Sequence, residues 1–370
     1  MSTTGFTFRT LLTAGVSLGL ASCNFEVPSS SYLSHTKLIS VVVEVVELGP
    51  LNPGRIGVPS AAPIAEPMPH DRVAFDAVVV DADGRRLPAE ELETMWFQCG
   101  VYDCSSIIYA SVGVAMHPCD EPDELGLSPT TDSICRLGRG NGRFEFTVPE
   151  LGQQLSKFRV AQYYGVIAWD GRSAESCWAA RQGDDGIENC AFIQRSVKVG
   201  PSWWMLVYAD SIGLTTVIPI HQIAAGVLIQ PANRVPIVNF VVAVDGEYAG
   251  TWPEATKFQA ALGSRIEISA VYDPTSQFLQ SYFRAERVGE PESETFLFTA
   301  ATEILFETAY SSNAIHAVER DPSLPEYVAL GKHEFVVDEY AKPETSRIWL
   351  VYFDDRFGEG VASFEFEVTP

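Results

Sequence analysis

The sequence predicts an all-β protein built from two β-sandwich domains. Three observations lead to this prediction. Short runs rich in β-branched and aromatic residues recur along most of the 370-residue chain, Gly, Pro, Asn and Asp separate these runs at fairly regular intervals, and long helical periodicity is scarce. Short strands with turn residues between them are typical of β-sandwiches, in which one face of each strand packs against the facing sheet.

The first half of the chain begins its strands at residues 37–48, KLISVVVEVVEL, a run that ends at Gly49-Pro50. A proline-rich stretch follows and is expected to form a loop. Alternation returns at residues 73–79 and ends at Asp81-Ala82-Asp83-Gly84, which is a turn sequence. Further strand-like runs in this half cover residues 95–99, 143–148, 163–169, 192–199 and 203–209.

A second series of strand-like runs follows residue 228. These runs cover residues 235–246, 265–273, 294–311, 333–341, 347–355 and 361–368. The segments 72–84 and 265–274 share an outline, because each places an alternating strand before a turn that contains Asp. This outline suggests two related modules, one over residues 37–228 and one over residues 229–370.

The last run, IWLVYFDDRFGEGVASFEFEV, resembles the final two strands of immunoglobulin-like and PKD-like modules. It contains an aromatic strand, an Asp- and Gly-containing turn and a final alternating strand. Together with the shared outline, the resemblance leads us to expect two immunoglobulin-like β-sandwich domains. The cysteines, none of which follows residue 228, indicate disulfide-stapled insertions in the first domain. The resemblance supports a fold more than a function.

The amino terminus predicts export. Residues 1–22 contain one charged side chain, Arg9, then an apolar run and small residues before Cys23, which is the order of a secretory signal. The apolar run is shorter than the roughly 20 residues that span a bilayer, so we expect its removal. Leu20-Ala21-Ser22-Cys23 resembles the lipobox of bacterial lipoproteins, which implies a lipid anchor on Cys23. The alternative is an ordinary signal peptide with an incidental cysteine.

The segment after the lipobox, residues 23–36, reads as a polar tether between the lipid and the first sandwich. Several acyl chains on one cysteine hold a protein firmly, whereas a single chain is marginal. The resemblance to bacterial lipoproteins implies the cell envelope as the location, and the absence of Asp at position 24 favours the outer membrane.

The net charge disfavours two classes of partner. The chain carries a formal charge of −23, and removal of residues 1–22 with Arg9 makes it −24. Such an acidic chain repels nucleic acid and anionic membrane surfaces. No later stretch has 18 consecutive apolar residues, so no transmembrane helix is expected.

The cysteines indicate an oxidising compartment. With Cys23 assigned to lipid, an even number remains, which argues for disulfides in an exported protein. Sequence proximity favours three pairs, although six cysteines permit 15 connectivities. Zinc is the weaker alternative, because no C-x₂-C pair or nearby histidine at ligand spacing is present. The favoured pairs are Cys99 with Cys104, Cys119 with Cys135, and Cys177 with Cys190.

Candidate metal ligands are few. Calcium takes 6 to 8 oxygen ligands, and neighbouring loop carboxylates can supply several of them. Chance pairs are expected among 48 acidic residues, so we predict no resident cofactor and keep calcium as a weak alternative. The calcium candidates are Asp81 with Asp83, and Asp354 with Asp355 and Glu359.

Other patterns that could carry function have a simpler structural interpretation. The six histidines show no metal or catalytic spacing, and no catalytic motif is present. The glycines of RLGRGNGRF precede a strand rather than a helix, so a hairpin turn is favoured over a phosphate site. Aromatic side chains suit sugar or protein recognition, but alternate members of a strand fill a core more often. The aromatic candidates are Tyr163, Tyr164, Trp169, Trp203 and Trp204.

These observations predict a lipid-anchored, disulfide-containing envelope protein with a non-enzymatic role in interaction, adhesion or scaffolding. Sandwiches without a catalytic cluster usually act by presenting loops and edges to a partner, here another envelope or surface protein or a glycan. The alternative is an envelope hydrolase or a carbohydrate-binding or carbohydrate-active protein. Two carboxyl groups ~5 to 9.5 Å apart in a pocket would distinguish that class.

Overall fold

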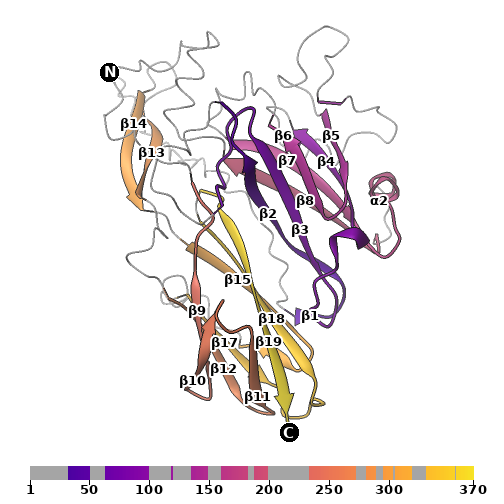
Figure 1. Cartoon of the computed structure of the whole chain (residues 1–370), viewed down its shortest axis with the longest axis vertical. Helices are drawn as coiled ribbons and strands as arrows, with labels where there is room; N and C mark the ends of the chain where they lie inside the picture. The colour runs from indigo at the N-terminus through magenta and orange to yellow at the C-terminus, as the bar shows by residue number, and fades with distance from the viewer. Residues whose placement is uncertain are drawn as a thin grey trace, which may run out of the picture.

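The structure is a computed structural model that describes residues 32–50, 63–99, 118–119, 135–148, 160–181, 187–198, 233–271, 281–288, 295–302, 305–318, 331–354 and 356–370. Most of these residues lie in β-strands, and the fold is all-β with two stacked sandwiches (Figure 1). The run at residues 203–209 lies outside the described residues.

The first sandwich contains a three-stranded and a four-stranded sheet. In the order of hydrogen-bonded neighbours, the first sheet is β2 (Lys37–Glu47), β3 (Arg72–Val80) and β6 (Arg143–Thr147). The second sheet is β5 (Cys135–Gly140), β4 (Glu93–Cys99), β7 (Val160–Ala168) and β8 (Cys190–Lys198). All neighbouring strands in both sheets are antiparallel. A 3-10 turn, η2 (Ala89–Glu91), precedes β4, and one short helix, α2 (Ala174–Ala180), connects β7 with β8.

The second sandwich contains two five-stranded sheets. One is β10 (Glu247–Trp252), β9 (Asn239–Val244), β12 (Arg265–Val271), β17 (Lys332–Val337) and β16 (Ile315–Ala317). The other is β1 (Tyr32–Leu33), β15 (Leu305–Ser312), β18 (Thr345–Asp354), β19 (Glu359–Thr369) and β11 (Lys257–Ala261). A further antiparallel pair is formed by β13 (Ser281–Val288) and β14 (Thr295–Thr302).

The two sandwiches repeat one strand connectivity. In each, the first, second and fifth strands of a seven-strand series form one sheet, and the third, sixth and seventh strands lie in the facing sheet. The series is β2, β3, β4, β5, β6, β7, β8 in the first sandwich and β9, β12, β15, β16, β17, β18, β19 in the second. The fourth strand differs, because β5 pairs with β4 whereas β16 pairs with β17. The shared outline of residues 72–84 and 265–274 therefore corresponds to equivalent central strands, β3 and β12.

The first core is built around aromatic rings that reach across from both sheets. Phe75 of β3 lies 4.7 Å from the ring of Trp96 and 5.1 Å from that of Tyr163, both edge-on. All three side chains are fully buried. A Cβ atom at Gly165 would lie 2.5 Å from the ring of Trp96, so this strand position leaves room for the indole. Burying such large side chains contributes about 2 to 3 kcal/mol each.

The sandwiches pack face to face through an apolar layer. Outward side chains of β3, including Val78 and Val80, meet Trp349 and Val351 of β18 in one buried cluster. The turn after β3 completes this contact, because the Trp349 Nε1–H donates to the Gly84 carbonyl at 2.7 Å. Both β3 and β18 are therefore buried on two faces, which explains their nearly continuous apolar sequences. Figure 1 shows β2 and β3 lying against β15 and β18.

The strand β1 lies within the segment that was predicted to be a tether. Tyr32 and Leu33 pair in parallel with Ser311 and Ser312 of β15. Leu33 is 1% exposed and belongs to the apolar cluster between the sandwiches. The chain is thus fixed to the second sandwich before it enters the first.

Two strand predictions need correction. The run at 294–311 is two strands, β14 and β15, in different sheets, and no Gly, Pro, Asn or Asp in the sequence marked the break. The glycine-rich segment between β5 and β6 is not a hairpin, because β5 pairs with β4 whereas β6 pairs with β3. The chain crosses there from one sheet to the other. Gly142 allows the crossing, since a Cβ atom there would lie 2.9 Å from Leu92.

Candidate functional site

The candidate site is a buried polar cluster where the two sandwiches meet, beside the turn between β18 and β19. Asp354 anchors this turn: its carboxylate accepts hydrogen bonds from the backbone N–H groups of Arg356 and Gly358, both at 2.8 Å. Phe357 adopts a φ of 69°, and a Cβ atom at Gly358 would lie 2.4 Å from the Asp354 carboxylate. The turn therefore closes tightly around its own carboxylate.

Two buried ion pairs extend from this turn into the first sandwich. Arg356 contacts Glu66 at 2.5 Å, and these side chains are 0% and 1% exposed. Arg195 of β8 contacts Glu359 at 2.5 Å, with exposures of 2% and 6%. The Ser40 hydroxyl of β2 donates to the same Glu359 carboxylate. Charges from both sandwiches thus neutralise each other inside the junction.

The segment that connects the sandwiches also enters this cluster. The Asn233 side chain donates to both carboxylate oxygens of Asp354 at 3.1 Å, and its backbone N–H donates to Glu66 at 2.8 Å. The backbone of residues 233–235 pairs with residues 63–65 through Ala65 N–H to Asn233 O at 2.9 Å and Val235 N–H to Pro63 O at 2.8 Å. The connecting segment is therefore held to the first sandwich by a short ladder.

Burial determines the electrostatics of the cluster. Removal from water raises the pKa of Asp354 to about 6, while the hydrogen bonds from Asn233, Gly358 and Arg356 act in the opposite direction. Buried ion pairs add little net stability but are costly when one partner is lost, so they favour a single geometry. We interpret the cluster as the device that fixes how the sandwiches pack.

The structure brings two calcium candidates, Asp354 and Glu359, into this cluster, but gives them protein partners. Arg195 and Arg356 supply positive charge there, which disfavours a divalent cation in the same place. Asp355 lies outside the described residues. Within the described ranges, no three or more His, Cys, Asp or Glu side chains are placed to hold a metal ion.

The other calcium candidates close a turn at the opposite end of the interface. The Asp81 carboxylate accepts the Arg85 backbone N–H at 2.7 Å, and Asp83 lies 3.4 Å from the Arg85 guanidinium. Gly84 completes this turn with a φ of 73°. Asp81 and Asp83 therefore have a structural role in the strand connection after β3.

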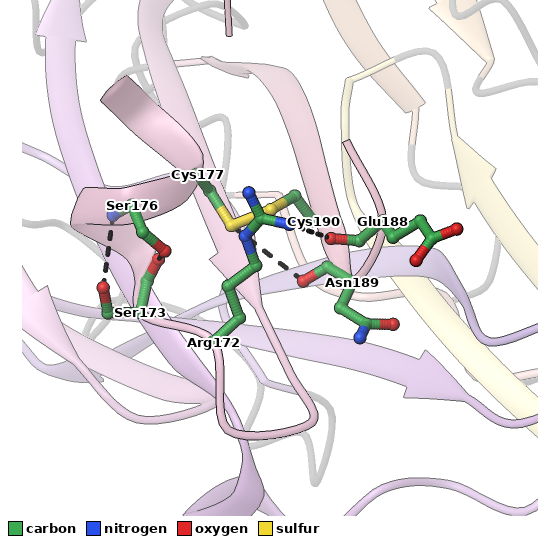
Figure 2. Close-up of a disulfide and its surroundings, with 7 residues drawn as sticks. All are labelled: Arg172, Ser173, Ser176, Cys177, Glu188, Asn189 and Cys190. Atoms are coloured by element: carbon green, nitrogen blue, oxygen red, sulfur yellow. Dashed lines mark hydrogen bonds between the residues drawn. A yellow bond between two sulfur atoms is a disulfide. The ribbon is translucent and has the colours of Figure 1, made fainter. Parts of the chain in front are cut away.

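The disulfides staple the outer sheet of the first sandwich. Cys177 on α2 is bonded to Cys190 at the start of β8, with an S–S distance of 2.00 Å (Figure 2). The hydroxyl of Ser173 caps α2 by accepting the Ser176 backbone N–H at 3.2 Å. Arg172 donates to the Glu188 carbonyl at 2.9 Å, which ties both ends of this connection together (Figure 2).

The remaining cysteines agree with this pattern where the structure describes them. Cys119 is bonded to Cys135 at the start of β5, and the two pairs seen are those that sequence proximity favoured. Cys99 is also disulfide-bonded. Its predicted partner Cys104 and the predicted lipid-bearing Cys23 lie outside the described residues. Every cysteine in the described ranges is therefore bonded.

The aromatic candidates that the structure describes pack inside the molecule. Tyr163, Tyr164 and Trp169 are at most 6% exposed, and Trp203 and Trp204 lie outside the described residues. Burial raises the pKa of Tyr164 to about 12. Tyr164 belongs to an apolar cluster on the outer face of β4 and β7, which α2 covers through Ala174 and Cys177. These tyrosines and Trp169 stabilise the sandwich rather than present a surface.

One polar side-chain contact joins the two sheets of the second sandwich. His333 of β17 lies 2.7 Å from the carboxylate of Glu307 on β15, measured from Nε2 to Oε2. The two residues are 26 positions apart in the sequence, and no motif there indicates that they form a pair. Nor does any motif indicate the partners of the junction residues Arg195 and Arg356, because these partners come from distant parts of the chain.

Comparisons with known proteins add no family. No family model matches the chain, and no curated protein matches it. Among solved structures, one similarity is to astrotactin-2, described as a conserved vertebrate-specific and perforin-like membrane protein involved in neuronal development. The sequence identity is 8% and the TM-score is 0.16, with 91% of this chain and 63% of the astrotactin-2 chain covered. The chain thus spans less than two thirds of that structure.

In the part of the chain that the structure describes, no helix is both long enough and apolar enough to cross a bilayer.

Proposed function

We propose that this protein is a lipid-anchored component of the bacterial cell envelope that binds or scaffolds a partner and has no catalytic role. The observation that carries the proposal is the state of the cysteines. All five in the described ranges are disulfide-bonded, which suits an oxidising compartment, and the lipobox assigns Cys23 a separate chemistry.

The fold class supports an interaction role. When the seven-strand series are lettered A to G, the second sandwich has sheets A-B-E-D and C-F-G, the arrangement of an immunoglobulin-like constant domain. The first sandwich differs by one strand, since its fourth strand joins the sheet of its third. We therefore propose that both sandwiches are immunoglobulin-like. Such domains commonly act by presenting loops and strand edges.

The buried carboxylates also favour a scaffold over a hydrolase. Asp354 has the raised pKa expected of a general acid, but it is 1% exposed and is hydrogen-bonded within the junction. A catalytic carboxyl must reach a substrate. Its burial instead supports a rigid relation between the sandwiches.

The test is metabolic labelling of the full chain with a fatty-acid analogue, comparing the native protein with Cys23→Ser. We expect the native protein to carry the label and to sediment with membranes. Cys23→Ser should lose the label and appear in the soluble fraction. A chain that keeps Met1, or that is labelled equally in both forms, would contradict the proposal.

A second experiment addresses the partner. Cross-linking in intact cells followed by mass spectrometry should recover an envelope protein or glycan with the native chain. Cys23→Ser is the matched control, because it retains the sandwiches but loses the anchor. A native chain that hydrolyses envelope glycans after purification would contradict a non-enzymatic role.

A further inference from the structure

One end of the second sandwich holds β1, the first described strand after the predicted lipid-bearing Cys23. Tyr32 pairs with Ser311, and Leu33 is buried between the sandwiches, so the chain is fixed to the second sandwich at Tyr32 and Leu33. Cys23 precedes Tyr32 by nine residues. Because an extended chain spans at most ~3.6 Å per residue, Cys23 lies no more than ~32 Å from Tyr32.

Two turns of the second sandwich lie at this end. The Tyr32 hydroxyl donates to the Asn313 carbonyl at 3.3 Å in the turn between β15 and β16. The Asp338 backbone N–H, which follows β17, donates to the Ala314 carbonyl at 2.7 Å. Tyr32 and the turn after β17 therefore both contact the segment at residues 313–314.

The turn after β17 presents an exposed aromatic side chain. Tyr340 is 88% exposed, the highest value among the large hydrophobic side chains of the described residues. Its backbone is ordered by two hydrogen bonds to Asp338, from Tyr340 N–H at 2.8 Å and from Ala341 N–H at 3.2 Å. A tyrosine combines an apolar ring with a polar hydroxyl, and such side chains are enriched at the level of lipid headgroups.

The opposite end of this sandwich has no aromatic side chain as exposed as Tyr340 among those whose exposure the structure describes. Phe306, at the start of β15, is 37% exposed and stacks on Phe353 at 5.3 Å. The strand β19 has 11 residues, so at ~3.3 Å per residue the two ends lie ~36 Å apart. A bilayer held close to Tyr32 would therefore meet Tyr340 well before Phe306.

We propose that the end of the second sandwich that carries Tyr32 and Tyr340 faces the membrane, with Tyr340 in contact with the headgroup layer of a zwitterionic bilayer. The inference rests on the lipid anchor of the proposed function. Charge does not drive the contact, because the exposed Lys342 stands between Glu339 and Glu344 in an acidic chain. The attachment of the tether at Tyr32 and the exposed Tyr340 ring favour this orientation, and a tether of up to ~32 Å is long enough to allow it.

The experiment uses the mature chain bound to phosphatidylcholine vesicles and places a fluorescent probe at one end or the other of the second sandwich. Tyr340→Cys and, as matched far-end controls, Phe306→Cys and Val271→Cys are labelled with an environment-sensitive maleimide dye. The parent protein, which has no introduced cysteine, is treated with the same dye to measure background labelling. Attachment is by the natural lipid on Cys23 or by an oligohistidine tag at position 23 bound to a nickel-chelating lipid.

We expect a quencher attached to the lipid headgroup to reduce the fluorescence of labelled Tyr340→Cys and to leave both far-end probes unchanged. Equal quenching at both ends, or stronger quenching at Phe306→Cys and Val271→Cys, would overturn the orientation. Circular dichroism of each variant verifies folding before the measurement. The tagged form tests orientation alone, whereas failure of the natural chain to bind vesicles would count against the lipid anchor.

Discussion

The two sandwiches share a strand connectivity but differ in the polarity of the outer faces of their sheets. The outer face of β4 and β7 in the first sandwich is apolar and includes Met95, Phe97 and Tyr164. The outer face of β12 and β17 in the second sandwich carries Glu267, Lys332 and Glu334, which form ion pairs. The first face requires a cover, whereas the second can meet water directly.

This difference explains where the disulfides lie. The helix α2 has seven residues and is too short to be stable alone, so it depends on its contacts. The Cys177–Cys190 disulfide holds α2 against the apolar face, and Trp178 of the same helix packs on Phe97 with ring centroids 4.6 Å apart. The covalent link thus compensates for a small apolar contact area.

The largest expected effect comes from breaking a buried ion pair at the junction. Arg356→Met should lower the free energy of unfolding by about 3 to 5 kcal/mol, because it leaves the Glu66 charge buried without its partner. Urea unfolding measures the change. Arg356→Met combined with Glu66→Leu should recover much of the loss, and a small effect of the single variant would show that the junction is not tightly packed.

Removal of the α2 disulfide should have the next largest effect. Cys177→Ser with Cys190→Ser removes a link across 13 residues, and the free energy of unfolding should fall by about 2 to 4 kcal/mol. Hydrogen exchange should increase first in α2 and on β4 and β7. Exchange that rises equally in the second sandwich would contradict a local role for this disulfide.

Titration of Asp354 should make junction stability depend on pH. Its pKa is raised from 3.8 to about 6, so the folded state binds a proton more tightly than the unfolded state. This contribution is complete below about pH 4 and is lost as pH rises through about 6, a difference of at most about 3 kcal/mol.

Asp354→Asn provides the matched control for that titration. The asparagine oxygen can still accept from Arg356 and Gly358. Its amide can donate to Asn233 Oδ1, which is buried without a hydrogen-bond partner in the described structure, once the Asn233 amide turns over, because Asn233 Nδ2 faces the Asp354 carboxylate in the native protein. Between pH 4 and 7, the free energy of unfolding of Asp354→Asn should therefore fall much less with rising pH than that of the native protein. An unchanged decline would assign the titration to another group.

The smallest effect is expected on the polar outer face of the second sandwich. Lys332 lies 2.6 Å from Glu267 and 3.5 Å from Glu334, and its side chain is 32% exposed. Lys332→Ala should change the free energy of unfolding by at most about 1 kcal/mol, because partly exposed ion pairs contribute little. A loss as large as that of Arg356→Met would remove the distinction drawn between the two regions.

Local patterns were sufficient to predict much of the fold. The dense apolar runs of β2, β3 and β18 and the alternation of β12 and β19 were visible in the sequence, because side-chain period and β-branched content are local properties. Strands with weaker patterns were missed. They include β5, with the glycine-rich sequence CRLGRG, and β10, whose first three residues are exposed.

The candidate site was only partly visible in the same way. The sequence indicated Asp354 and Glu359 as neighbouring carboxylates, but it gave no sign of their arginine and asparagine partners. Arg356 meets Glu66 across 290 residues of sequence, and Asn233 meets Asp354 across 121. No local spacing encodes contacts of that separation, so an acidic turn was indistinguishable from a calcium loop.

The sequence by itself determined the all-β class and the turn at residues 81–84, and sequence proximity favoured the two disulfide pairs that the structure shows. Each of these features depends on residues close together in the chain. Only the tertiary structure decided that the sandwiches stack face to face, that Leu33 is buried between them and that five distant segments share one buried polar cluster. These features depend on which apolar faces meet and which charges lose water together. Both follow from long-range packing and not from any local pattern.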